Sequence, residues 1–230
     1  PLNQNDVRNT YLMSYFRHLK SGTTCVGEFS LPFLEKGFAH MLNCIERTEV
    51  KNVVALQNWD QISKAGTLTG GRHRFLVNMG KEEEFTVYSF ENLLRAAKEL
   101  KVPLLAHVGE QRYDVELIRK TFQKSILGVL QDFRTVRPDT VFVHLNHLSS
   151  QETEHLAGAG ASAVICARSA AFKRTGYPSL RHLARENIRL AVGTDWGRVD
   201  MLEELRFLHR LHLLISGIPE LTPLQLVRMG

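Results

Sequence analysis

The sequence predicts an α/β protein in the form of a (β/α)8 TIM barrel that lacks its first strand. Short apolar, β-branched runs recur along the chain, and each is followed by a longer stretch with helical periodicity. That alternation is typical of βα units around a parallel sheet. Seven such runs occur where a closed barrel needs eight, and the opening segment, residues 7–20, has a helical pattern with no strand before it.

The predicted strands and helices follow one another in a regular order. The strand-like runs are, in chain order, Cys25–Phe29, Asn52–Leu56, Arg74–Asn78, Pro103–His107, Thr140–His144, Ala163–Cys166 and Arg189–Gly193. Apolar residues spaced by three and four predict helices at residues 90–100 and 201–216. Ser89 is a candidate N-cap of the first of these, and Ser149 or Ser150 is a candidate N-cap of the helix after the fifth strand.

An open, doubly wound sheet is the alternative arrangement of the same elements. Such sheets usually hold a phosphate in a Gly-rich loop that follows a strand, and no loop of that kind follows any of the seven runs. The barrel is therefore favoured over the doubly wound sheet. Residues 60–72, which include three glycines, predict a mobile loop.

Length and composition are those of a globular protein. The 230 residues, 43% hydrophobic and 23% charged, predict one domain over residues 1–230. The net charge is +5, but basic and acidic residues alternate on helix faces, so we expect no nucleic-acid partner. The three cysteines are far apart, which indicates neither a disulfide framework nor a thiolate zinc site. No apolar run reaches the roughly 18 residues of a membrane helix, so we expect a cytoplasmic protein without membrane contact.

Polar residues that suit catalysis follow three of the predicted strands. His107 ends one strand with Glu110 three residues on, His144 ends the next, and Asp195 follows the last. In a barrel enzyme the chemistry lies at the carboxyl ends of the strands. Two imidazoles and a carboxylate suit zinc or iron, and Glu110 would relay protons. A single His after a strand is as often a hydrogen-bonded rim residue, but four such residues at one end of the strands are hard to explain by packing alone.

Several short segments are similar to the motifs of one enzyme superfamily. They are Ser21-Gly22-Thr23-Thr24, residues 86–93, Ala106-His107-Val108-Gly109-Glu110, Val143-His144-Leu145-Asn146-His147-Leu148-Ser149 and Gly193-Thr194-Asp195. In order and spacing they resemble the amidohydrolase superfamily, and within it the cytosine and guanine deaminases and the s-triazine chlorohydrolases. The resemblance spans nearly the whole chain.

The resemblance implies a role for each matching residue. His107 would be a metal ligand, Glu110 the catalytic acid and base, and Asp195 both a metal ligand and a catalytic base. His144 would contact the metal or the substrate during catalysis. The implied cofactor is one divalent metal ion, with zinc first and iron as the alternative.

The chain also departs from the family pattern. The family's first strand ends in His-x-His, which supplies two metal ligands, and this sequence contains no His-x-His. The accessory β-sandwich that the family builds from both termini is missing as well, so we expect a barrel domain that is incomplete at both ends. Ser169-Ala170 stands where the family often has Ser-Asn. We expect Ser169, His147 and Trp196 to face the substrate, with Trp196 as a stacking surface or else a packed rim aromatic.

These observations predict a metal-dependent hydrolase that acts on a C–N or similar bond, with deamination of an N-heterocycle by activated water as the reaction. The expected partner is a small heterocyclic substrate. A homo-oligomer is expected because a missing strand leaves unpaired sheet edges. The alternative is a metal-deficient relative that acts as a binding or regulatory protein, which the missing His-x-His would also explain. A metal-dependent lyase on a similar barrel rests on fold analogy alone.

Overall fold

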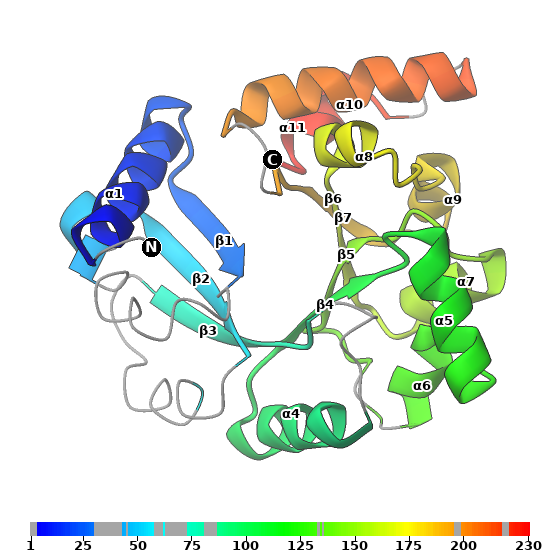
Figure 1. Cartoon of the computed structure of the whole chain (residues 1–230). Coiled ribbons are helices and arrows are strands. Elements are labelled where there is room, and N and C mark those ends of the chain that lie inside the picture. The colour runs from blue at the N-terminus through cyan, green and yellow to red at the C-terminus, as the bar shows by residue number, and fades with distance from the viewer. Residues whose placement is uncertain are drawn as a thin grey trace. The chain divides into compact units, whose positions relative to one another are not determined.

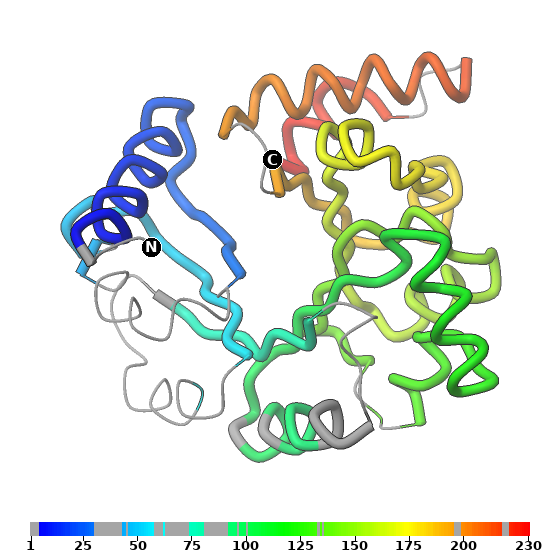
Figure 2. Tube along the Cα trace, in the orientation of Figure 1, coloured from blue at the N-terminus to red at the C-terminus, as the bar shows by residue number. Residues whose placement is uncertain are grey.

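The structure of the protein, a computed structural model, describes most of the chain. The described residues are 4–29, 43–44, 46–57, 62, 73–80, 87–132, 134, 136–195, 199–217 and 221–230. The chain divides into two compact units, residues 1–78 with 91–103 and residues 79–90 with 104–230. Figures 1 and 2 trace both units, and each is described here by itself.

Unit 1 holds three parallel strands and a helix that packs beside them. Its elements are α1 (Gln4–Lys20), β1 (Cys25–Phe29), β2 (Lys51–Leu56) and β3 (His73–Asn78), and it contains most of α4 (Val87–Leu100). Strand β2 pairs in parallel with β1 and with β3. Tyr15 of α1 is buried, and its hydroxyl accepts a 2.6 Å hydrogen bond from Asn52 and donates a 3.0 Å bond to Glu28. These bonds fasten α1 to two strands.

Unit 2 holds four parallel strands and the helices that connect them. Its strands are β4 (Leu104–Val108), β5 (Val141–His144), β6 (Ser162–Ile165) and β7 (Arg189–Val192). Its helices are α5 (Arg112–Phe122), α6 (Ile126–Asp132), α7 (Ser150–Gly158), α8 (Ala167–Lys173), α9 (Leu180–Arg185), α10 (Met201–Ser216) and α11 (Pro223–Val227). The strands pair in chain order, and α5, α7 and α9 lie on one side of them (Figure 1).

The strand order explains how this chain places side chains at one edge of the sheet. Each strand of unit 2 pairs in parallel with the next along the chain, so every connection must return past the sheet, and a helix makes that return. The central strands are buried, with Phe142 and Ala163 fully so. Because the strands of unit 2 are parallel, their carboxyl ends all lie at the same edge of the sheet. The sequential order without a reversal confirms the α/β prediction and matches part of a (β/α)8 barrel rather than a doubly wound sheet.

The predicted boundaries are confirmed in most places. Each predicted strand is observed within about one residue of its expected ends, and α10 spans residues 201–216 as predicted. Ser149 caps α7 in a capping box with Glu152. The expectation for Ser89 is wrong, because α4 begins at Val87 and contains Ser89. A serine marks the start of a helix only where the residues before it are not helical, and the sequence just before Ser89 contains no glycine or proline that would prevent a helix.

The remaining sequence predictions can be compared with the described residues only in part. Within the described part of the chain, no helix is both long and apolar enough to cross a membrane. All three cysteines are free thiols. Of the predicted loop at residues 60–72, only Ile62 is described. Whether residues 1–230 form a single domain and whether the protein is cytoplasmic stay predictions.

Candidate active site

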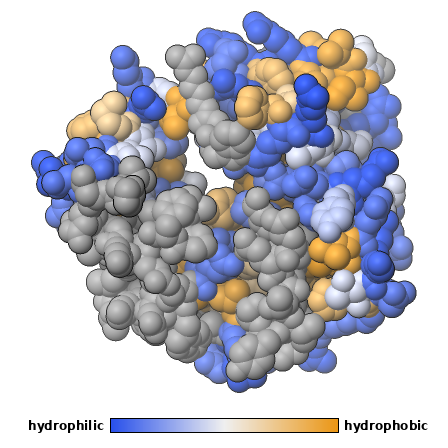
Figure 3. Space-filling view, viewed as in Figure 1, coloured by the Kyte–Doolittle hydropathy of each residue, from blue (hydrophilic) through white to orange (hydrophobic). Residues whose placement is uncertain are grey.

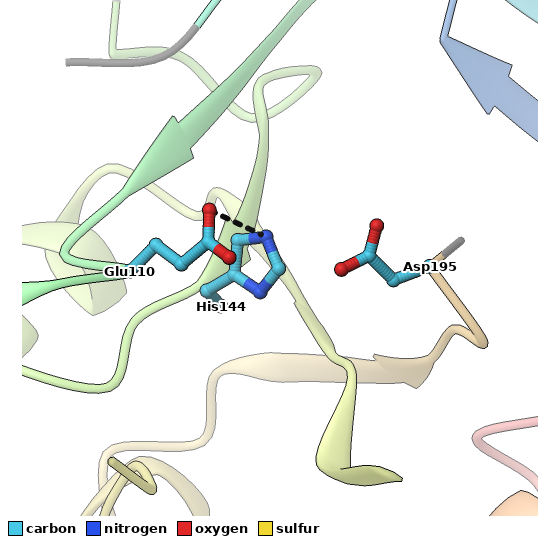
Figure 4. A group of neighbouring side chains, drawn as sticks. All are labelled: Glu110, His144 and Asp195. Atoms are coloured by element: carbon cyan, nitrogen blue, oxygen red, sulfur yellow. Dashed lines mark ion pairs between the residues drawn. The ribbon is translucent and has the colours of Figure 1, made fainter. Parts of the chain in front are cut away.

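Three side chains from three strands of unit 2 converge at the carboxyl edge of the sheet. Glu110 follows β4, His144 is the last residue of β5, and Asp195 follows β7. One ligand atom of each lies within 4.8 Å of the others. Figure 4 shows the three side chains pointing toward one another. The parallel strand order brings these three strand ends together, and the catalytic and metal-binding roles of the residues stay predictions.

The backbone at two of these positions adopts a conformation that non-glycine residues rarely use. His144 has φ of 80°, Leu145 of 60° and Asp195 of 52°. Such left-handed residues cost about 1 kcal/mol or more and persist where the surrounding structure holds them. Here the turn after β5 is fixed to the end of β4, because the amide of Leu145 donates to the carbonyl of Val108 at 2.9 Å. The strained turn aims the His144 side chain into the cluster.

His144 is buried and electrically neutral. Its side chain is 2% exposed, and its Nε2 lies 3.5 Å from Oε2 of Glu110. Burial lowers the pKa of His144 to about 4, although the Glu110 carboxylate acts against this. Neither ring nitrogen has a hydrogen-bond partner among the described residues. A neutral buried imidazole in that state has a lone pair to offer to a metal ion or a substrate.

Asp195 receives two hydrogen bonds on the same oxygen. Its Oδ2 accepts from Ser169 Oγ at 2.5 Å and from Lys173 Nζ at 2.6 Å. Burial acts to raise the pKa of Asp195, but the bonds from Lys173 and Ser169 outweigh it and hold the pKa below its usual value. Asp195 is therefore a carboxylate at neutral pH.

Lys173 bridges the two acidic residues of the cluster. Its Nζ donates to Oε1 of Glu110 at 2.7 Å as well as to Asp195. Burial acts to lower the pKa of Lys173, but the hydrogen bonds from its ammonium to Asp195 and Glu110 raise the pKa above its usual value. The ammonium thus stays charged between the two carboxyl groups.

His107 lies beside the cluster without being part of the three-residue group. Its ring stacks on that of His144, with centroids 5.2 Å apart and planes at 25°. Its Nδ1 lies 3.3 Å from the carbonyl oxygen of Gly80. If Nδ1 carries the proton in that contact, Nε2 holds the lone pair, which is the tautomer that a metal ligand needs.

The three residues expected to face a substrate have different surroundings. Ser169 is 4% exposed and bonds to Asp195. Nε2 of His147 lies 2.7 Å from the carbonyl oxygen of Thr175. Trp196 lies outside the described residues. Contact of any of them with a substrate stays a prediction.

Sequence reasoning missed the residues that hold Glu110. They are Lys173, already described, and Asn146, whose Nδ2 donates to the Glu110 carbonyl at 3.1 Å and to Thr175 Oγ1 at 3.2 Å. One signal was available for Lys173, because it follows Ser169 by four residues and so lies on the same face of α8. No sequence pattern marks Asn146 or Thr175.

The cluster has the chemistry of a divalent metal site. Imidazole nitrogen and carboxylate oxygen are ligands that zinc and iron accept. The buried His144 ring without a hydrogen-bond partner among the described residues is the observation that fits a ligand position best. The residues present therefore fit a divalent metal ion.

Comparisons with known proteins show the family of this chain. Residues 2–230 match the amidohydrolase family. A probable guanine deaminase of Schizosaccharomyces pombe is 28% identical over 111 residues, which cover 46% of this chain and 21% of that protein. The chain therefore matches only a minor part of this relative's length.

Two solved structures show the same fold. An adenosine deaminase from Xanthomonas campestris with bound zinc has a TM-score of 0.87 at 20% identity, over 100% of this chain and 56% of that one. A variant of atrazine chlorohydrolase from Arthrobacter aurescens, complexed with zinc and atraton, has a TM-score of 0.87 at 15% identity, over 99% and 58%. The predicted resemblance to deaminases and triazine chlorohydrolases is confirmed.

Proposed function

Because this chain belongs to the amidohydrolase family, we propose that it forms the active site of a metal-dependent hydrolase that deaminates a small N-heterocycle. The observation that carries the proposal is the convergence of Glu110, His144 and Asp195 within 4.8 Å at the ends of three parallel strands. Support for the substrate class comes from the similarity to a guanine deaminase and an adenosine deaminase.

His144 and Asp195, with His107 beside them, would hold the metal ion. Zinc is the first choice and iron the alternative, because both accept imidazole and carboxylate ligands and keep a position for water. When bound, such an ion supplies the Lewis acidity that activates water at neutral pH. Asp195 contributes a carboxylate that stays charged, since the pKa of its side chain is lowered.

Glu110 would move the proton during the reaction. The attacking water must lose a proton and the leaving amine must gain one, and a single carboxylate within reach of both can do this. The Glu110 side chain is 4% exposed and faces His144. Lys173 holds its Oε1, and Asn146 holds its carbonyl group, so the carboxylate is fixed in place. His147, Ser169 and Trp196 are proposed to contact the heterocycle.

One observation favours a second candidate, a metal-deficient relative that binds a partner or regulates. The Lys173 ammonium lies 2.7 Å from Glu110 and 2.6 Å from Asp195, so it balances both carboxyl groups without a metal ion. A site of that kind would bind a heterocycle without converting it.

Metal content separates the two candidates. Elemental mass spectrometry of the full-length protein should find about one zinc or iron per chain, and Asp195→Asn and His144→Asn should lose it. The controls are Asp132→Asn and His155→Asn, which change exposed residues of the same types. Ammonia release from guanine, adenosine and aminotriazines then tests the reaction. A full-length protein that takes up no metal even after incubation with zinc would favour the metal-deficient candidate.

A further inference from the structure

Lys173 contacts both acidic residues of the candidate metal site. Its Nζ lies 2.7 Å from Oε1 of Glu110 and 2.6 Å from Oδ2 of Asp195. The Lys173 side chain is 20% exposed, and those of Glu110 and Asp195 are 4% and 17% exposed. Partial burial shields this arrangement from water, so its charges act on one another more strongly than surface charges do.

Contacts at both ends of α8 hold Lys173 near Glu110 and Asp195. Helix α8 is anchored at its start, where the amide of Arg168 donates to Glu204 at 2.9 Å. It ends at Lys173, and Arg174 takes the left-handed C-cap conformation. The amide of Thr175 then donates to the carbonyl of Ala170 at 3.1 Å. A lysine at the last position of an anchored helix has less freedom than a lysine on an open surface.

One oxygen of Asp195 accepts hydrogen bonds from both Lys173 and Ser169. Oδ2 accepts the Lys173 ammonium at 2.6 Å and the Ser169 hydroxyl at 2.5 Å. A divalent ion on this carboxylate would lie a few ångströms from the ammonium, and two positive charges at that distance repel strongly in a partly buried site. A metal ion on Asp195 would therefore compete with the ammonium of Lys173 for this carboxylate.

We propose that Lys173 is a positioning residue that takes the cation position between Glu110 and Asp195 in the metal-free protein and thereby weakens the affinity of the site for divalent metal. On metal binding the ammonium leaves Asp195 and stays with Glu110, which it holds in place for proton transfer. This inference rests on the proposed function, because it assumes that the cluster is a metal site. Beyond the proposed function, the inference assigns Lys173 a role in setting the affinity of the site for the metal.

The test is the zinc affinity of Lys173→Met, measured in the full-length protein by competition with a chromophoric chelator. The methionine keeps most of the side-chain length but removes the charge. Zinc affinity should rise about tenfold or more, because the competing cation is gone. Lys173→Arg keeps a cation and should bind zinc about as weakly as the wild type. Lys124→Met is the matched control, since Lys124 pairs with exposed Asp132 at 2.6 Å outside the site.

The sign of the change separates competition from a structural role. If Lys173 merely supported the shape of the site, Lys173→Met would bind zinc more weakly, and that result would overturn the inference. Equal zinc binding by wild type and Lys173→Met would overturn it too while leaving the proposed function in place. If neither protein bound zinc, both the inference and the metal-dependent function would fail. Circular dichroism of each variant checks that it is folded.

Discussion

Ser169 donates a hydrogen bond from Oγ to Oδ2 of Asp195 over 2.5 Å, and it does so from a side chain that is 4% exposed. The pair joins the first turn of α8 to the end of β7. The bond is to a charged, partly buried carboxylate, and such bonds contribute more than neutral ones. It fixes the orientation of the carboxylate that we place on the metal.

Ser169→Ala should lower the free energy of unfolding by about 1 to 2 kcal/mol in the metal-free protein, because Asp195 loses a buried donor. Urea unfolding measures the change. Ser150→Ala, at an exposed position of α7, is the control and should change the stability by a few tenths of a kcal/mol at most. A Ser169→Ala effect no larger than that of the control would mean that the bond contributes nothing to stability.

Glu110→Gln should lower kcat by roughly 10²- to 10⁴-fold, which is the usual contribution of general acid–base catalysis. The amide keeps the size of the side chain but cannot relay a proton. Zinc content, measured on the same samples, should stay near the wild-type value, because Glu110 acts on the proton rather than as the main ligand in the proposal. Glu154→Gln, which changes an exposed residue of α7, serves as the control. Unchanged turnover in Glu110→Gln would exclude Glu110 as the proton relay.

The strands and the polar residues at their carboxyl ends could be predicted because both are visible in short segments of the sequence. Each strand is a short apolar run, and the residue at or just after its end is read directly from the chain. His144 and Asp195 were found this way, and the parallel order of the strands then brings them together. The start of α4 was not predicted, because Ser89 resembles an N-cap while the residues before it also favour a helix.

The rest of the site depends on contacts between distant parts of the chain. Lys173 lies 63 residues from Glu110 in sequence, and their contact depends on where α8, which packs against α10, lies relative to the end of β4. Asn146 supports Glu110 through the backbone carbonyl group, a contact that no residue pattern reveals. Helix orientation and contacts with the backbone depend on tertiary packing. They therefore cannot be predicted from composition or periodicity.

Gly176→Ala should lower the free energy of unfolding by more than the strain of an alanine with a left-handed backbone. Gly176 has φ of +96°, and a Cβ there would lie 2.8 Å from Cε1 of His147. Strain in the backbone costs about 1 kcal/mol, and the clash should add about 1 to 3 kcal/mol by pushing His147 away from Thr175.

Gly217 provides the matched comparison. It has φ of +69°, and a Cβ there would meet nothing within 4 Å, so Gly217→Ala carries the backbone strain without the clash. Urea unfolding of both variants therefore isolates the contribution of the clash. Equal losses of stability in the two variants would show that the His147 side chain moves aside at little cost.

Glu28 should make the stability of the protein fall as the pH rises toward neutrality. Burial raises the pKa of Glu28 from 4.5 to about 7, although hydrogen bonds from Tyr15 and Asn52 act against this. The folded state thus binds a proton more tightly than the unfolded state does. The contribution of Glu28 to the free energy of unfolding is greatest below pH 4.5. It decreases between pH 4.5 and about 7 and is constant above that range.

Glu28→Gln measures this effect because glutamine does not titrate. Each pKa unit corresponds to about 1.4 kcal/mol, so the variant should gain up to about 3 kcal/mol relative to the wild type between pH 4.5 and pH 8. Urea unfolding at both pH values gives the difference, and Glu46→Gln, at an exposed position in the same unit, should show no such dependence. A stability difference between Glu28→Gln and the wild type that stays constant over this range would mean that Glu28 has the same pKa in the folded and unfolded protein. The Tyr15 and Asn52 contacts would then compensate fully for its burial.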